Sequence, residues 1–224
     1  MKKCALHSLG CKVNSYETQA MQKMMESAGY EIVPFGEEIA DIYIINTCSV
    51  TNIADRKSRQ MIHKAKKINP EAVVAAAGCY VESAGDNIDE DVDIVIGNNE
   101  KSHLIEILNE YFEHMDKEKS VDIGKATGFD ELNIDSPLEH TRAYVKIQDG
   151  CNRFCSYCII PYVRGRIRSR KPDDVMAEIK RVAASGCKEV VLTGIHLSSY
   201  GLDFKDSTVK LIDVIEAVNR IEGI

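Results

Sequence analysis

The sequence predicts an α/β protein with a doubly wound parallel sheet in its N-terminal part, followed by the first strand–helix units of an α/β barrel. Short apolar segments alternate with segments whose apolar residues recur every three or four positions, which is the pattern of strands and helices in parallel sheets. A stretch with a weaker pattern separates two such series. The 224 residues are enough for two domains of ordinary size.

The first series has four apolar segments that predict buried strands, at Cys4–Leu9, Asp41–Asn46, Ala72–Ala77 and Val92–Ile96. Helical spacing predicts the helices Tyr16–Ala28, Ile53–Ile68 and Lys101–His114. Strands that alternate with helices pair in parallel, with helices on both faces of the sheet. The pattern then weakens from Met115 to Glu139. We therefore expect an N-terminal domain at 1–115, a linker at 116–140 and a second domain at 141–224.

The second series begins with a strand at Thr141–Gln148 and a long loop that ends at Lys171. A helix at Pro172–Ser185, a strand at Glu189–Thr193 and a helix at Val209–Arg220 are predicted next. Two such units cannot close a barrel, and their sheet would keep a hydrophobic edge. We therefore expect a truncated barrel in a chain that is a fragment.

Composition places the protein in the cytoplasm and away from membranes. The sequence has no run of about 18 apolar residues, and its first residues are too polar for a secretory signal. The net charge of −7 argues against a uniformly basic nucleic-acid binder. However, residues 81–140 hold 17 acidic and 4 basic residues, so the remainder carries +6 and leaves room for a basic surface.

The strongest motif is CxxxCxxC, at Cys151, Cys155 and Cys158, directly after a predicted strand. Clustered cysteines in a reducing compartment indicate metal or redox chemistry. Three thiolates can hold three irons of a [4Fe–4S] cube and leave the fourth iron open. S-adenosylmethionine (SAM) can chelate that iron through its amino and carboxylate groups, as radical SAM enzymes require. The alternatives are a zinc knuckle that lacks one ligand, or buried cysteines.

A second set of cysteines is dispersed: Cys11, Cys48 and Cys79 each follow a predicted strand by one to three residues. In a parallel sheet these positions share the carboxyl edge, where ligands gather. They could hold a second cube, and Gly10 and Gly78 would let the backbone approach it. A cysteine taken alone is more often a small buried hydrophobe. Cys4 and Cys187 are predicted to be such packing residues.

The segments Ser8–Asn14, Asn46–Thr51 and Ala77–Cys79 resemble the N-terminal domain of the radical SAM methylthiotransferases, and the CxxxCxxC loop resembles their catalytic motif. This resemblance implies two [4Fe–4S] clusters and SAM as cofactors, and a reductant such as flavodoxin or ferredoxin. It also implies that the second cluster supplies or relays sulfur while a SAM-derived radical activates the acceptor carbon. Tyr157 resembles the aromatic residue that this superfamily places beside the SAM adenine; its alternative role is loop packing.

The subfamily is indicated by Cys11–Thr18 and Thr47–Lys57, which resemble enzymes that modify threonylcarbamoyladenosine beside the tRNA anticodon. Sister enzymes act on isopentenyladenosine or on a ribosomal protein, and their usual Gly-Cys-Gln-Met-Asn and Gly-Cys-Pro-Lys-Asn variants are absent. Family members also carry a complete barrel and a small RNA-binding β-domain. A non-catalytic iron–sulfur or RNA-docking fragment therefore remains an alternative. An NAD-binding enzyme is disfavoured, because the glycine fingerprint is missing after the first strand.

Several weaker candidates have two interpretations each. Thr193 and Gly194 end the second barrel strand, where the superfamily contacts the SAM amino group, or they form a simple turn. Asn14 and Asn46 could line the second cluster or satisfy turns. A basic stretch and the basic face of Ile53–Ile68 could hold tRNA phosphates or be solvated charges. The basic stretch comprises Arg164, Arg166, Arg168, Arg170 and Lys171.

Overall fold

The computed structural model describes residues 1–114, 128–134, 142–205 and 208–224, and its N-terminal sheet is fully parallel. The strand order is β2-β1-β3-β4-β5. The strands are β1 (Lys3–Ser8), β2 (Glu31–Ile32), β3 (Ile42–Thr47), β4 (Val73–Gly78) and β5 (Ile94–Ile96). The four strands predicted from the sequence lie within two residues of their expected bounds. β2 was not predicted, because a two-residue strand has no recognisable periodicity.

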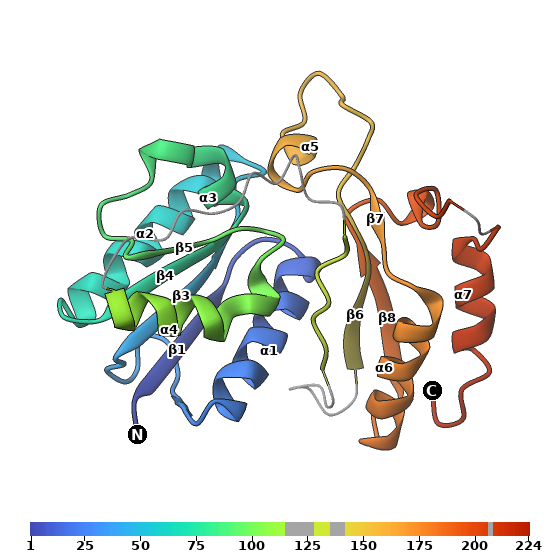
Figure 1. The fold of residues 1–224 in the computed structure, drawn as a ribbon, viewed down its shortest axis with the longest axis horizontal. Coiled ribbons are helices and arrows are strands. Elements are labelled where there is room, and N and C mark those ends of the chain that lie inside the picture. The colour runs from blue at the N-terminus through green and yellow to red at the C-terminus, as the bar shows by residue number, and fades with distance from the viewer. Residues whose placement is uncertain (115–127, 135–141, 206–207) are drawn as a thin grey trace.

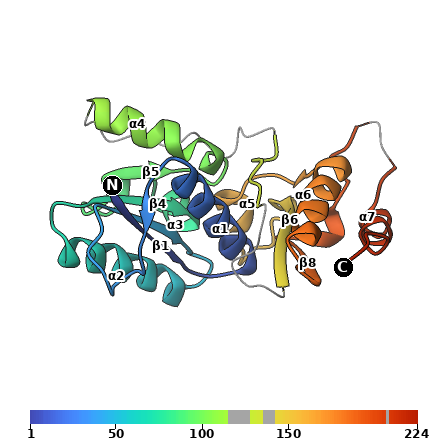
Figure 2. The same cartoon turned by 90° about the horizontal axis from the view of Figure 1, so that it is seen from below.

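Helices cover both faces of this sheet, as a doubly wound fold requires. Helices α1 (Lys12–Ser27) and α4 (Leu104–His114) pack on one face, and α2 (Asn52–Ile68) and α3 (Cys79–Ala84) pack on the other. Figure 2 shows α4 and α2 on opposite sides of the strands. Ile42 and Ile44 of β3 face α1 and α4, while Tyr43 and Ile45 face α2, because side chains alternate along a strand.

Helix α1 begins four residues earlier than the sequence pattern suggests, directly after Cys11. Gly10 has a φ of +97°, which reverses the chain in the few residues after β1. Val13 is already buried and starts the apolar face of the helix. The early start places Asn14 and Glu17 inside the protein rather than on a surface loop.

The second sheet has the order β7-β6-β8. Strands β6 (Arg142–Asp149) and β8 (Glu189–Gly194) are parallel and are connected through α6 (Pro172–Ala184), while α7 (Leu211–Val218) packs beside α6. The expectation of an uninterrupted loop up to Lys171 is wrong. That segment contains the short helix α5 (Ile160–Val163) and the strand β7 (Arg168–Ser169), which turns back antiparallel to β6.

The two parts of the molecule lie against each other along α1 and β6 (Figure 1). Most of the predicted linker 116–140 lies outside the described residues, but 128–134 is described. There Leu132 and Ile134 are buried between Tyr16 of α1 and Val182 of α6. No helix in the described part of the chain is both long and apolar enough to cross a membrane.

Candidate active site

The structure brings Cys11, Cys48 and Cys79 together at the carboxyl edge of the N-terminal sheet. Cys11 is the residue before α1, Cys48 follows β3 directly, and Cys79 opens α3 directly after β4. Strands β1, β3 and β4 are adjacent. Burial raises the pKa of the Cys48 thiol, and the nearby Cys79 and Cys11 raise it further. We call these three residues the N-terminal triad.

Two glycines allow the backbone to approach the N-terminal triad closely. A Cβ atom on Gly10 would lie 2.7 Å from the sulfur of Cys48. A Cβ atom on Gly78 would lie 2.5 Å from the carbonyl oxygen of Thr47. Both glycines have a φ of +97°. A side chain at either position would therefore displace the turns that carry the cysteines.

Asn14 stabilises the turns of the N-terminal triad through hydrogen bonds of its side chain. Its buried side-chain amide donates hydrogen bonds to the carbonyl oxygens of Leu9, at 2.7 Å, and Thr47, at 2.8 Å. Its Oδ1 accepts from Arg164 and lies 3.8 Å from the sulfur of Cys11. Asn46 donates to the backbone of Asn14 at 3.0 Å. The sequence left the roles of both residues open; these contacts show that Asn14 braces the turns and that Asn46 joins β3 to α1.

The loop with Cys151, Cys155 and Cys158, here called the barrel triad, starts at the carboxyl end of β6. Gly150 has a φ of +70° and turns the chain out of the strand. The backbone N–H of Cys151 donates to the carbonyl oxygen of Gly165 at 3.0 Å, and the N–H of Cys158 donates to Cys155 at 2.9 Å. Cys151 is buried, Cys155 is exposed and Cys158 is intermediate. The loop thus presents its later two thiols outward.

The residues predicted to contact SAM lie near this loop. Tyr157 is 91% exposed, so its ring is available to a ligand. Thr193 and Gly194 end β8, where Gly194 pairs with Gln148 of β6. A Cβ atom on Gly194 would lie only 3.0 Å from the Gln148 side chain, so the two strand ends meet closely. His196 bonds within its own loop, to Ser199 at 2.6 Å, which fits a loop residue.

A hollow of about 310 Å³ lies between the barrel-triad loop and the loop after β8. It is lined by Asn152, Arg153, Ile167, Ser199, Leu202 and Asp203. This volume is at the lower end of the range for small-molecule sites, about 300–1,000 Å³. The hollow adjoins the barrel-triad loop through Asn152 and Arg153.

The donor chemistry of each triad bears on the group that it could hold. Among the described residues, the ligand atoms of His63, Asp89 and Asp91 all lie within 4.8 Å of one another, and neither cysteine triad forms so compact a group. A structural zinc ion is usually held by four protein ligands, and each triad supplies three thiols. Their chemistry, three thiolates per site, suits iron–sulfur ligation.

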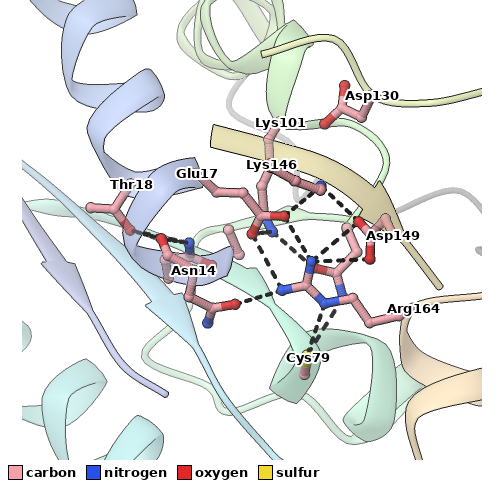
Figure 3. Close-up of polar contacts among 12 residues, drawn as sticks. Asn14, Glu17, Thr18, Cys79, Lys101, Asp130, Lys146, Asp149 and Arg164 are labelled. Atoms are coloured by element: carbon pink, nitrogen blue, oxygen red, sulfur yellow. Dashed lines mark hydrogen bonds and ion pairs between the residues drawn. The ribbon is translucent and has the colours of Figure 1, made fainter. Parts of the chain in front are cut away.

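A buried set of charged residues lies against Cys79 of the N-terminal triad (Figure 3). Arg164, at the end of α5, pairs with Glu17 of α1 at 2.7 Å and with Asp149 of β6 at 3.3 Å. Lys101 and Lys146 also pair with Glu17, at 2.5 and 2.7 Å. All five residues are at most 1% exposed. We call them the buried charge network.

Ionisation in this network is set by mutual pairing rather than by burial. Burial alone would raise the pKa of Glu17, but Arg164, Lys101 and Lys146 hold it well below its usual value. Burial would likewise raise the pKa of Asp149, but Lys146 and Arg164 lower it to about 2. Both carboxylates are therefore charged at neutral pH.

The sequence analysis missed this network. Lys146 lies among alternating residues of β6, which looked like the solvent-facing side of a strand. That side meets α1 instead, so Lys146 is fully buried. Glu17 lies in a predicted helix, and a glutamate there gives no indication that its side chain is buried. One available signal is the spacing of Val13 and Glu17, four residues apart, which places both on the same buried face of α1.

Both interpretations of the basic stretch are wrong for three of its five residues. Arg164 and Arg170 are fully buried and Arg168 is 3% exposed, so they neither reach tRNA phosphates nor face solvent. Arg170 pairs with Glu178 and with Glu131. Arg166 and Lys171 are exposed. Tertiary pairing with carboxylates distant in sequence overrides the local charge pattern.

Comparison with known proteins finds a matching family for each of the two parts of the molecule. Residues 3–97 match a family described as uncharacterized protein family UPF0004, and residues 145–222 match the radical SAM superfamily. The chain is 42% identical to the threonylcarbamoyladenosine tRNA methylthiotransferase MtaB of Bacillus subtilis, over 100% of this chain and 50% of that protein. The chain therefore carries a UPF0004 domain and a radical SAM domain, and over its whole length it is related to tRNA methylthiotransferases.

Two further relatives are covered to a similar extent. The MtaB protein of Aquifex aeolicus is 42% identical over 99% of this chain and 54% of its own length. The tRNA-2-methylthio-N(6)-dimethylallyladenosine synthase of Moorella thermoacetica is 36% identical over 96% of this chain and 50% of its own length. The chain thus spans about half the length of the curated relatives it matches.

A solved structure confirms the predicted fold of the chain. The radical SAM methyltransferase TsrM of Kitasatospora setae, with tryptophan and a SAM analogue bound, aligns with a TM-score of 0.59. The alignment covers 97% of this chain and 51% of TsrM, at 12% sequence identity. At this identity the likeness concerns the fold alone, an α/β sheet domain followed by part of a radical SAM domain.

Proposed function

We propose that this chain forms the cluster- and SAM-binding part of a cytoplasmic enzyme that methylthiolates threonylcarbamoyladenosine next to the tRNA anticodon. One observation carries the proposal: the two cysteine triads are joined through consecutive residues. Arg164 contacts the sulfur of Cys79 at 3.4 Å, and the carbonyl of Gly165 accepts the Cys151 N–H at 3.0 Å. Two metal sites held this closely are suited to a single reaction.

Each triad would hold one [4Fe–4S] cluster. With three thiolates the barrel triad would leave one iron open to bind SAM, and the bound cluster would supply the electron for the radical chemistry. Tyr157 would lie along the adenine, and Thr193 and Gly194 would receive the amino group. The N-terminal triad would hold the cluster from which sulfur is transferred. In this proposal residues 1–115 form the domain that binds the second cluster, and residues 141–224 form the domain that binds SAM. Residues 116–140 are the linker between the two domains.

The substrate is proposed from the most similar relatives and from the nature of the target. Both MtaB proteins are 42% identical, against 36% for the Moorella synthase, whose name gives a dimethylallyladenosine product. A base in an anticodon loop is unpaired and can be turned into a pocket. Dimethylallyl- (isopentenyl-) adenosine is the second candidate substrate. A flavodoxin or ferredoxin would supply electrons.

The test is the nucleoside content of tRNA from cells that lack their own threonylcarbamoyladenosine methylthiotransferase and express the protein containing this chain. We expect 2-methylthio-threonylcarbamoyladenosine to appear in mass spectra of digested tRNA. A matched control carries Cys155→Ala and should give none. Appearance of methylthio-isopentenyladenosine alone would move the assignment to the second substrate. If deoxyadenosine forms but neither methylthio nucleoside appears, the protein is a radical SAM enzyme that acts on another substrate, and the proposed substrate is wrong.

A further inference from the structure

Arg164 contacts the N-terminal triad although it belongs to the barrel-triad segment of the chain. Its Nε donates to the sulfur of Cys79 at 3.4 Å, within the range for hydrogen bonds to sulfur. Its Nη2 donates to Asn14, which braces the Cys11 turn, and its Nη1 donates to Glu17 at 2.7 Å. Figure 3 shows the guanidinium between Asn14, Glu17, Asp149 and Cys79. All three nitrogens of this fully buried side chain thus have directed partners.

The Cys79 sulfur is one of several acceptors around a group of buried cations. Lys101, Lys146 and Arg164 share Glu17, and Lys146 and Arg164 also pair with Asp149. Arg168 adds a further cation at 3.7 Å from Asp149. Buried charges are costly unless they are compensated. A metal-bound cysteine is a thiolate, so Cys79 as a ligand would place a negative charge directly against the Arg164 guanidinium.

We propose that Arg164 is a positioning residue for the N-terminal cluster: it donates a charged hydrogen bond to the Cys79 sulfur and thereby raises the reduction potential of that cluster. The inference rests on the proposed function, since it requires a cluster at the N-terminal triad. Hydrogen bonds to the sulfurs and nearby charge both set the potentials of iron–sulfur clusters. A buried cation favours the reduced cluster because reduction adds negative charge.

The residues on either side of Arg164 also contact the two cysteine triads or their neighbours. Val163, next to Arg164, accepts a hydrogen bond from Asn98 at 2.6 Å, and the same amide lies 3.9 Å from the Cys79 sulfur. Gly165 on the other side holds Cys151. The stretch Val163–Gly165 therefore fixes both triads relative to each other.

The test is potentiometry of the N-terminal cluster alone, in the full chain with Cys151→Ala, Cys155→Ala and Cys158→Ala. In this background Arg164→Gln should lower the equilibrium constant for one-electron reduction about tenfold, a potential shift of about 59 mV to lower values. Arg164→Lys, which keeps the charge but has one donor group, should shift it in the same direction by less. Arg170→Gln is the matched control, because Arg170 is an equally buried arginine paired with carboxylates but lacks a sulfur contact.

The outcomes separate the inference from the function on which it rests. A shift in both Arg164 variants and none in Arg170→Gln supports the positioning role. Unchanged potential in Arg164→Gln, with stability lowered as in Arg170→Gln, overturns it and leaves Arg164 a structural residue. If Arg164→Gln does not fold, an unshifted Arg164→Lys overturns it equally. A background chain that binds no iron would refute the N-terminal cluster itself, and the inference with it.

Discussion

Replacing Glu17 with Gln is expected to lower the free energy of unfolding by about 3–5 kcal/mol, because it removes one partner from a buried set of charges. Glu17 is fully buried and pairs with Lys101, Lys146 and Arg164. Gln is nearly isosteric but neutral, so Lys101, Lys146 and Arg164 would lose the carboxylate that they share. Chemical denaturation of the apo chain at neutral pH measures the loss.

The control for this prediction is Glu38→Gln. Glu38 pairs with Lys3 at 2.8 Å, but both side chains are more than one-third exposed, so the change should cost less than about 1 kcal/mol. Acid provides a second check. The pKa of Glu17 is lower in the folded chain than its ordinary value of 4.5, so its contribution is complete above that pH and declines as the pH falls. Equal stability of Glu17→Gln and wild type at neutral pH would contradict the account.

Gly150→Ala is expected to destabilise the chain by about 2–5 kcal/mol and to prevent cluster assembly at the barrel triad. The residue has a φ of +70°, and an added Cβ would lie 1.9 Å from the carbonyl oxygen of Arg166. Arg166 lies two residues before β7, whose pairing with β6 fixes the backbone that follows, so its carbonyl cannot move far. Denaturation and iron content of the same variant measure the two effects.

A second glycine with positive φ but no neighbouring atoms serves as the control. It separates the cost of backbone strain from the cost of the steric clash at Gly150. Gly186 has a φ of +93°, and an added Cβ there would meet nothing within 4 Å. Gly186→Ala should therefore cost only the strain, about 1–2 kcal/mol, and keep all its iron. If both variants behave alike, the tight turn at Gly150 does not position the cysteine loop.

Much of the fold follows from local patterns in the sequence. The strands of the parallel sheet are buried on both faces, so they appear as continuous apolar runs such as Ile42–Ile45. The sequence also places Cys11, Cys48 and Cys79 after adjacent strands, and the sheet order then brings them to one edge. Short elements such as β2 and β7 could not be predicted, because two residues carry no periodicity.

The interior charges could not be predicted because their partners are distant in sequence. Arg164 and Glu17 are separated by 147 positions, and Lys146 and Glu17 by 129. Local reasoning treats each of these residues as a surface charge. Only the docking of α1 on β6 shows that they compensate one another and that Arg164 reaches Cys79.

The most direct test of the two-cluster account is the content of iron, acid-labile sulfide and zinc per chain after anaerobic reconstitution. Wild type should hold about eight irons and eight sulfides, as two [4Fe–4S] clusters require. Changing either triad to Ala should remove half of both, and changing both triads should remove all. Cys4→Ala with Cys187→Ala is the control and should lose none, since these two buried cysteines lie outside both triads. Full iron after loss of the N-terminal triad, or stoichiometric zinc in the wild type, would contradict the account.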